Sequence, residues 1–205
     1  MNMADTVYTK IYAAPPINNR EILRYLGVDG DAPEVSALVD ECIKEAQDAL
    51  SYKVCYRELG ISLDGDVLDL GFVKTNSAAL KRNLSGCESV TVFAATVGIS
   101  LDRLITRYSA VSQTKAVIFD AIGTERIEAL CDVFNEDVRT KAASNGYTAH
   151  PRFSPGYGDF PIEAQRQIFS VLDCPRKIGL TLNDSMLMSP SKSVTAIIGI
   201  AKTNA

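Results

Sequence analysis

The chain has 205 residues, of which 46% are hydrophobic and 22% are charged, so it can bury a core of ordinary size. Its net charge of −4 and its pI near 5.1 argue against a basic groove for nucleic acid. No apolar run reaches the roughly 18 residues that a membrane helix needs, and the N-terminus lacks a secretory signal pattern. We therefore expect a cytoplasmic protein of one domain that binds neither a membrane nor nucleic acid.

Strand and helix signals alternate along the first third of the chain. Asn18 or Asn19 can cap a helix that runs through Leu26 and stops at Gly27. Pro33 suits the first turn of a second helix, in which apolar residues recur at helical spacing. Strands are expected over residues 7–12, 52–59, 61–63 and 67–70, the last two joined by an Asp64-Gly65 hairpin turn.

The middle of the chain predicts one buried strand and three helices. Residues 77–84 predict a short helix, Val90 to Ala95 a buried strand, and residues 101–108 a helix after Gly98. The longest helix is expected over residues 113–143, with a single stripe of apolar or small residues. The stripe consists of Ala116, Phe119, Gly123, Ile127, Leu130, Phe134 and Val138. Gly123 costs about 1 kcal/mol relative to alanine, a cost that close packing on a neighbouring backbone would offset.

The C-terminal part predicts a long loop, a helix and a β-hairpin. Pro161 opens a helix that ends at Leu172, and strands near residues 178–188 and 193–201 form the hairpin. The loop over residues 145–160 is the only long irregular stretch in this half, and such loops are often functional. We expect residues 1–110 and 111–205 to be parts of the same domain.

Five cysteines are spread along the chain without the paired spacing of a metal site. Reduced, buried thiols are the expected state of Cys42, Cys55, Cys87, Cys131 and Cys174. A reactive Cys174 is the alternative there, since it lies in a predicted loop beside Arg176 and Lys177. His150, the only histidine, is expected to be a solvated loop residue rather than a catalytic group.

Arg152-Phe153-Ser154-Pro155-Gly156-Tyr157 combines a fixed cation, two turn-forming residues and an aromatic phenol in the long loop. The arginine fork suits a carboxylate, the Pro-Gly pair permits a tight turn, and the tyrosine offers a flat face. A small zwitterion that carries a flat ring could use all three. By local chemistry alone, an ordinary turn with a surface arginine is the competing interpretation.

This pattern, Arg-x-x-x-Gly-Tyr followed by Pro161 and a helix, resembles the S-adenosylmethionine-binding signature of the activation domain of cobalamin-dependent methionine synthase. Residues 178–190 and Ser193-Val194 are similar to the same domain. The likeness covers roughly residues 115–200 and is weak over residues 1–110. The resemblance implies an α+β fold with a mixed, mainly antiparallel twisted sheet flanked by helices.

The resemblance also implies how the site is built. Arg152 would bind the carboxylate of S-adenosylmethionine, and Glu128 its amino group or ribose. Tyr157 would stack near the adenine or face the corrin, and Ser154 and Gly156 would supply backbone contacts. No catalytic residue and no metal site are implied, because the sulfonium already activates the methyl group. The competing interpretation of Glu128 is a solvated acidic helix face, shared with residues 125 and 132 at helical spacing.

The function that the resemblance implies is reductive reactivation in trans. The chain would bring S-adenosylmethionine to a cobalamin-bearing methionine synthase, or to a related corrinoid protein, while an electron donor reduces the cobalamin that this partner carries. It would be an accessory to a methyltransferase, without turnover of its own. Two alternatives stay open: an activator of another corrinoid methyltransferase, and an interaction protein that kept the fold. The second is favoured by Ile198, which stands where the family has an aromatic, and by a family acid near the domain's start that has no counterpart.

Overall fold

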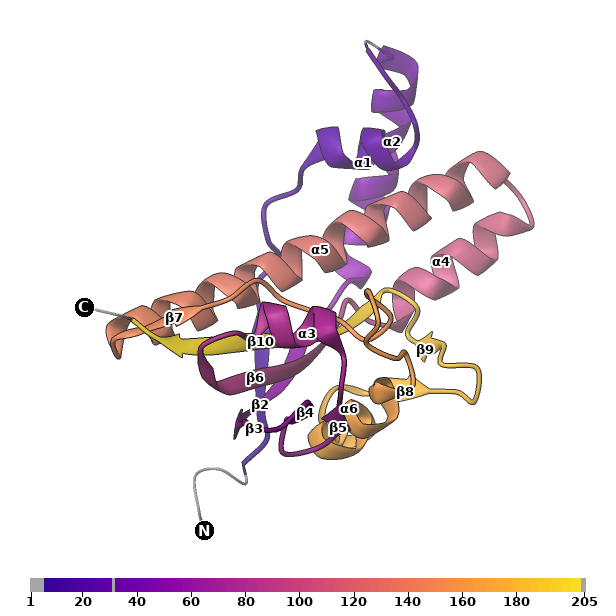
Figure 1. Ribbon diagram of the computed structural model, residues 1–205. Helices are drawn as coiled ribbons and strands as arrows, with labels where there is room; N and C mark the ends of the chain where they lie inside the picture. The colour runs from indigo at the N-terminus through magenta and orange to yellow at the C-terminus, as the bar shows by residue number, and fades with distance from the viewer. Residues whose placement is uncertain (1–5, 31, 204–205) are drawn as a thin grey trace.

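A five-stranded antiparallel sheet organises the fold in the computed structural model, which describes residues 6–30 and 32–203 (Figure 1). Its strand order is β1-β2-β6-β10-β7, and every neighbouring pair is antiparallel. The strands are β1 (Tyr8–Tyr12), β2 (Tyr52–Gly60), β6 (Cys87–Thr96), β10 (Ser193–Lys202) and β7 (Tyr147–Ala149). The predicted α+β class with a mainly antiparallel sheet is confirmed.

Helices cover both faces of this sheet. The helix α5 (Gln113–Ser144) crosses one face, where α1 (Asn19–Tyr25), α2 (Pro33–Ala46) and α4 (Ile99–Ser109) pack against it. The opposite face carries α3 (Ala78–Asn83), α6 (Ala164–Leu172) and α7 (Cys174–Ile178). Successive residues of β6 therefore enter different cores: Phe93 packs toward α5, and Val92 packs toward α6. Burial on both faces explains why every residue of the predicted strand at residues 90–95 except Thr91 is apolar.

Several local signals produce the predicted elements. Asn18 caps α1 by accepting a hydrogen bond from the Glu21 amide, and Ser77 caps α3 by accepting one from the Leu80 amide. The hairpin at Asp64-Gly65 joins β3 (Ser62–Asp64) to β4 (Val67–Asp69), and β5 (Lys74–Thr75) extends this small sheet. A turn of 3₁₀ helix, η2 (Gln47–Ala49), follows α2.

The predicted C-terminal β-hairpin is wrong. Cys174 to Ile178 form the helix α7, with Pro175 in its first turn and Gly179 ending it at φ +71°. Only β8 (Thr181–Leu182) and β9 (Met188–Ser189) pair within the region expected as a single strand. The strand β10 instead lies inside the main sheet, between β6 and β7. The helix expected from Pro161 begins three residues later, at Ala164.

The stripe predicted along α5 is buried, and it explains the mid-helix glycine. A Cβ at Gly123 would lie 2.3 Å from Leu101 Cδ2 and 2.8 Å from Lys192 Cγ. The close neighbours are therefore side chains of α4 and of the segment before β10, rather than the backbone that the sequence suggested. Gly123 lets α5 lie close to both.

Gly123→Ala is therefore expected to destabilise the protein, although alanine is the better helix former. Overpacking in a filled core costs about 1–3 kcal/mol, which exceeds the propensity gain of about 1 kcal/mol. Urea denaturation monitored by circular dichroism would measure the change. An unchanged or higher midpoint would show that the Leu101 side chain yields without cost.

A buried ion pair on α5 holds the segment that joins β1 to α1. Arg126 is 1% exposed and binds Glu125 at 2.5 Å, the Pro15 carbonyl at 2.6 Å and the Pro16 carbonyl at 2.7 Å. Glu125 also accepts a hydrogen bond from the Asn18 amide at 3.1 Å. The predicted acidic face of α5 is thus wrong for Glu125, which points into the structure and closes a structural clamp.

Candidate functional site

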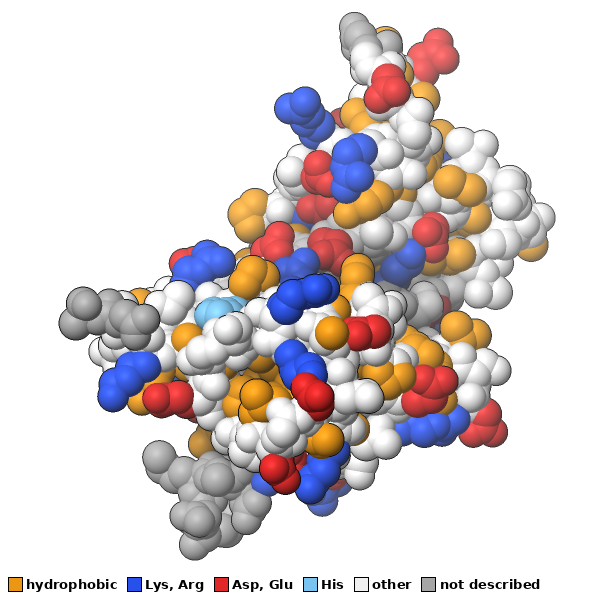
Figure 2. All heavy atoms as spheres, viewed as in Figure 1, with side chains coloured by type: hydrophobic (Ala, Val, Ile, Leu, Met, Phe, Trp, Pro, Cys, Tyr) orange, Lys and Arg blue, Asp and Glu red, His pale blue; other side chains and the backbone are white. Residues whose placement is uncertain are grey.

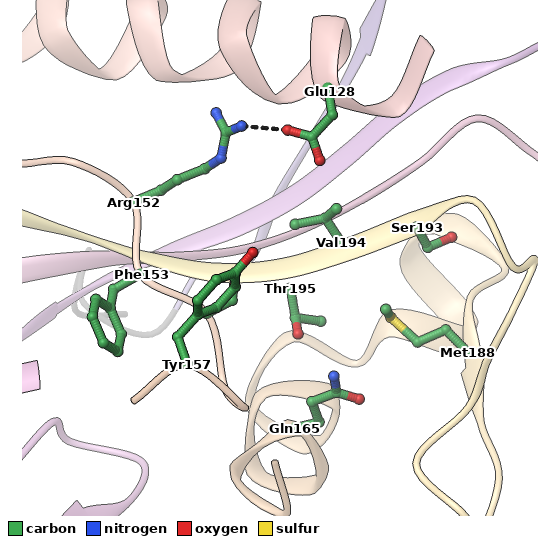
Figure 3. A pocket seen from close by; sticks show the side chains of 10 residues that line it. Glu128, Arg152, Phe153, Tyr157, Gln165, Met188, Ser193, Val194 and Thr195 are labelled. Atoms are coloured by element: carbon green, nitrogen blue, oxygen red, sulfur yellow. Dashed lines mark hydrogen bonds and ion pairs between the residues drawn. The ribbon is translucent and has the colours of Figure 1, made fainter. Parts of the chain in front are cut away.

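The residues predicted to bind a ligand gather at a pocket of about 290 Å³, near the lower end of ligand-site volumes. Arg152, Ser154 and Tyr157 come from the loop between β7 and α6, and Glu128 comes from the facing side of α5 (Figure 3). Gly156 belongs to this loop without lining the pocket. The rest of the wall consists of Phe153, Gln165, Met188, Ser193, Val194 and Thr195.

The guanidinium of Arg152 is held by two carboxylates of α5. One terminal nitrogen donates to Glu128 Oε2 at 2.6 Å, and the other donates to Asp132 Oδ1 at 2.6 Å. The two predicted ligand groups, Arg152 and Glu128, therefore bind each other in the chain without ligand. Asp132 is the more exposed partner, with 71% of its side chain accessible compared with 43% for Glu128. Glu128 and Asp132 share the helix face that the sequence predicted, and their role there is to orient the arginine.

The loop that carries Arg152 is fixed to the central sheet. Phe153 and Ile197 exchange two backbone hydrogen bonds of 2.8 and 2.9 Å, which attach the loop to β10. The Gly156 amide donates to the Phe160 carbonyl at 2.8 Å, and Gly156 adopts φ +92°. This confirms the predicted tight turn and places Tyr157 at its tip, where 66% of the residue is exposed.

Asp159 ties the same loop to α3. Its carboxylate accepts hydrogen bonds from the Ser77 hydroxyl at 2.5 Å, the Ala78 amide at 2.7 Å and the Ala79 amide at 3.1 Å. These donors favour the charged form and lower the pKa of Asp159 to about 2. The sequence analysis missed this contact, because nothing local to Asp159 indicates the helix N-terminus that it meets across the fold.

Acid is expected to release this anchor. The folded-state pKa of Asp159 lies below the unfolded value of about 3.9, so its stabilising effect is complete above about pH 4 and is lost as the pH falls toward 2. A carbon-detected NMR titration of the carboxyl group would measure the midpoint, with Asp159→Asn as the assignment control. Titration of Asp159 near pH 4 would contradict the anchoring role.

Two buried polar groups at the inner end of the pocket have no hydrogen-bond partner. Gln165 on α6 is 6% exposed and Thr195 on β10 is 2% exposed, and within residues 6–30 and 32–203 neither Gln165 Oε1 nor Thr195 Oγ1 has a hydrogen-bond partner. Both side chains lie on the far side of Tyr157 from the Arg152–Glu128 pair, next to Met188 (Figure 3). Sequence reasoning missed both residues, because a glutamine in a helix and a threonine in a strand carry no signal of a binding site.

Ile198 has no bearing on the pocket. It is buried in the core between the sheet and α5, whereas the β10 residues that line the pocket are Ser193, Val194 and Thr195. Ile198 therefore gives no structural support to the alternative of an interaction protein that kept the fold.

The remaining reactive groups lie outside the pocket wall. His150 is partly buried, and its Nδ1 lies 2.6 Å from the Asn83 carbonyl oxygen. Cys174 is wholly buried with its Sγ 4.0 Å from that of Cys55, and the contact with this thiol, together with burial, raises the pKa of Cys174. A reactive Cys174 is therefore wrong. All five cysteines are free.

The described part of the chain offers no metal cluster and no membrane helix. No group of three or more His, Cys, Asp or Glu side chains within residues 6–30 and 32–203 is placed to hold a metal ion. Within the same ranges, no helix is both long and apolar enough to cross a bilayer. Acidic and basic side chains are interspersed on the face shown in Figure 2, where no broad area carries a single sign.

Comparison with known proteins assigns the fold and the family. Residues 77–205 match the family model described as "Vitamin B12 dependent methionine synthase, activation domain". A crystal structure of the MetH reactivation domain bound to AdoHcy is similar in fold, with a TM-score of 0.67 and 16% sequence identity. That likeness covers 98% of this chain and 80% of the other, so it includes the N-terminal part where the sequence resemblance was weak. No curated protein matches the chain. Because the family model matches more than half of it, the chain belongs to the family of vitamin B12-dependent methionine synthase activation domains.

Proposed function

We propose that the chain binds S-adenosylmethionine in the pocket between α5 and the loop after β7, and that it presents this ligand to a separate cobalamin-dependent methionine synthase. The observation that carries the proposal is the Arg152–Glu128 pair at one end of the pocket, next to the exposed ring of Tyr157. Arg152 offers N–H donors to an amino-acid carboxylate, and Glu128 accepts from an ammonium group. The AdoHcy bound by the similar reactivation domain has the same amino-acid end.

The chemistry needs no acid or base from this chain. The methyl group leaves the sulfonium, whose bonding electrons remain on sulfur as a thioether, and an external electron donor supplies the reducing electrons. The protein contributes binding and orientation, which can lower a barrier substantially by themselves. Tyr157, at the exposed tip of its turn, lies where a partner that carries the methyl acceptor would make contact.

Two measurements test this function. Calorimetry should detect S-adenosylmethionine binding by the wild-type chain. A reactivation assay, with an oxidised cobalamin methyltransferase from the same source, a reductant and S-adenosylmethionine, should run faster when the chain is added. Tyr157→Ala should slow reactivation more than it weakens ligand binding, while Tyr25→Ala, an exposed tyrosine on α1, should change neither. No acceleration with any cobalamin protein of the source would refute the proposal.

A second function, that of an interaction protein without ligand, is favoured by one observation. Arg152 is already neutralised by Glu128 and Asp132, as a purely structural arginine would be. Calorimetry separates the two functions, because only the first requires S-adenosylmethionine to bind. A pull-down of cobalamin proteins would identify a different corrinoid methyltransferase as the partner.

Gly156→Val is expected to weaken S-adenosylmethionine binding with limited damage to the global fold. Valine is strained at the observed φ of +92°, and its Cβ would lie 3.2 Å from Ile162 Cδ1. The loop must therefore shift, and Arg152 and Tyr157 shift with it. Titration calorimetry and thermal unfolding would report the two effects separately. Unchanged ligand affinity would mean that Gly156 serves only the turn.

A further inference from the structure

The inner end of the pocket contains hydrogen-bonding capacity that the protein does not use. Gln165 Oε1 is an acceptor without a donor, and Thr195 Oγ1 can donate and accept but does neither. Ser193, two residues earlier on β10, shows the contrast: its hydroxyl lies 2.8 Å from both Thr96 Oγ1 and the Pro190 carbonyl oxygen. Burying a polar group without a partner costs stability, so the unused pair at Gln165 and Thr195 indicates a ligand group.

The position of this pair assigns it to one end of the ligand. In Figure 3, Val194 lies on the same side of β10 as Arg152 and Glu128, whereas Thr195 lies on the opposite side of this strand, with Gln165 and Met188. If the amino-acid end of S-adenosylmethionine binds Arg152 and Glu128, its base points toward Gln165 and Thr195. The thioether of Met188 and the ring of Tyr157 are suitable contacts for the face of a flat base.

We infer that Gln165 and Thr195 read the edge of the adenine ring, with the Gln165 carbonyl accepting from the 6-amino group and the Thr195 hydroxyl donating to N1. The inference rests on the proposed function, because it needs S-adenosylmethionine in the pocket. The match is chemically specific, because this edge of adenine carries a donor, the 6-amino group, beside an acceptor, N1. Gln165 Oε1 offers the matching acceptor and the Thr195 hydroxyl offers the matching donor. A site that pairs buried polar groups with a ligand rejects analogues that lack the matching group.

An analogue of the ligand tests the inference without altering the protein. The wild-type chain should bind S-adenosylmethionine about ten-fold or more tightly than the analogue in which purine replaces adenine, lacking only the 6-amino group. Gln165→Met should bind both with similar affinity. Thr195→Val should weaken S-adenosylmethionine about five- to ten-fold, and Thr195→Ser should restore most of the loss.

The free protein supplies a second readout and a matched control. Without ligand, Thr195→Val should melt at the same or a higher temperature, because it removes an unpaired buried hydroxyl. Asn135 on α5 has the same defect, an unpaired buried Oδ1, but does not line the pocket, so Asn135→Leu should leave the preference for adenine unchanged.

The outcomes distinguish this inference from the proposed function. If wild type binds S-adenosylmethionine and its purine analogue equally, while Arg152→Ala still loses binding, the adenine assignment is wrong and the proposed function stands. The adenine assignment is also wrong if Asn135→Leu reduces the preference for S-adenosylmethionine over its purine analogue as much as Gln165→Met does. If wild type binds no S-adenosylmethionine, the proposed function fails and the assignment fails with it.

Discussion

Arg152→Ala should reduce the affinity for S-adenosylmethionine by about 10- to 150-fold, the loss expected for a charged hydrogen bond worth roughly 1.5–3 kcal/mol. Glu128 and Asp132 hold the guanidinium in one orientation, so its remaining N–H donors are directed before the ligand arrives. Arg152→Lys should recover little, because a single ammonium cannot bind two carboxylates and a ligand in the same planar geometry. Isothermal titration calorimetry at fixed ionic strength is the measurement.

Arg139 on α5, the helix that carries Glu128 and Asp132, offers a matched control. It is exposed, pairs with Glu136 at 2.5 Å and does not line the pocket, so Arg139→Ala should leave the affinity unchanged. Equal affinity for S-adenosylmethionine in wild type and Arg152→Ala would contradict the proposal that Arg152 binds the carboxylate of the ligand. A parallel loss in both variants would indicate a general electrostatic effect, which added salt should then suppress.

Arg126→Met should produce the largest loss of stability, about 3–5 kcal/mol, because removing one partner leaves the other charge buried and unpaired. That charge is Glu125, and the Pro15 and Pro16 carbonyls lose their donor in the same substitution. Denaturation by urea, followed by circular dichroism, would measure the free energy of unfolding.

A double variant separates burial of charge from loss of packing. Arg126→Met combined with Glu125→Gln removes both charges, so it should recover part of the loss. Arg139→Met, at the exposed pair, should cost less than about 1 kcal/mol. If Arg126→Met lowers the free energy of unfolding no more than Arg139→Met does, the buried ion pair contributes little to the stability of the fold.

Elements with strong local signals were predictable from the sequence. The cap at Asn18, the short helix after Ser77 and the hairpin near Asp64-Gly65 depend on contacts within a few residues, so their structural basis is local. The stripe along α5 repeats over many turns, and repetition makes a period hard to mistake.

Elements whose state depends on distant partners were not predictable. The strand β7 pairs with β10, some fifty residues later, and although Asn145-Gly146 marks a turn before it, three residues are too few to show an alternating pattern. The region at residues 178–188 was predicted as one strand, but α7 ends at its first residue, Ile178, and a hydrogen-bonded turn between Asn183 and Leu187 divides the rest into β8 and β9.

The residues of the candidate site also divide into those that the sequence could predict and those that depend on distant partners. Arg152, Glu128 and Tyr157 were found because their spacing resembles a family signature, and the structure places all three at one pocket. Asp132 and Asp159 were not assigned because their hydrogen-bond partners come from other elements, and Gln165 and Thr195 were not assigned because only folding brings α6 and β10 to one pocket wall. Ser154 lines the pocket as expected, whereas Gly156 shapes the turn behind it.

The interior position of β10 sets the order in which the molecule can be completed during synthesis. The strands β2 and β6 can pair soon after they are made, but one edge of β6 stays open until about a hundred further residues have followed. During that interval the nascent chain presents an apolar strand edge, the kind of surface on which aggregation begins. Arrival of β10 closes that edge, gives β7 its partner and delivers Ser193, Val194 and Thr195 to the pocket. The pocket is thus among the last features to form, and a chain with a complete pocket has already completed its central sheet.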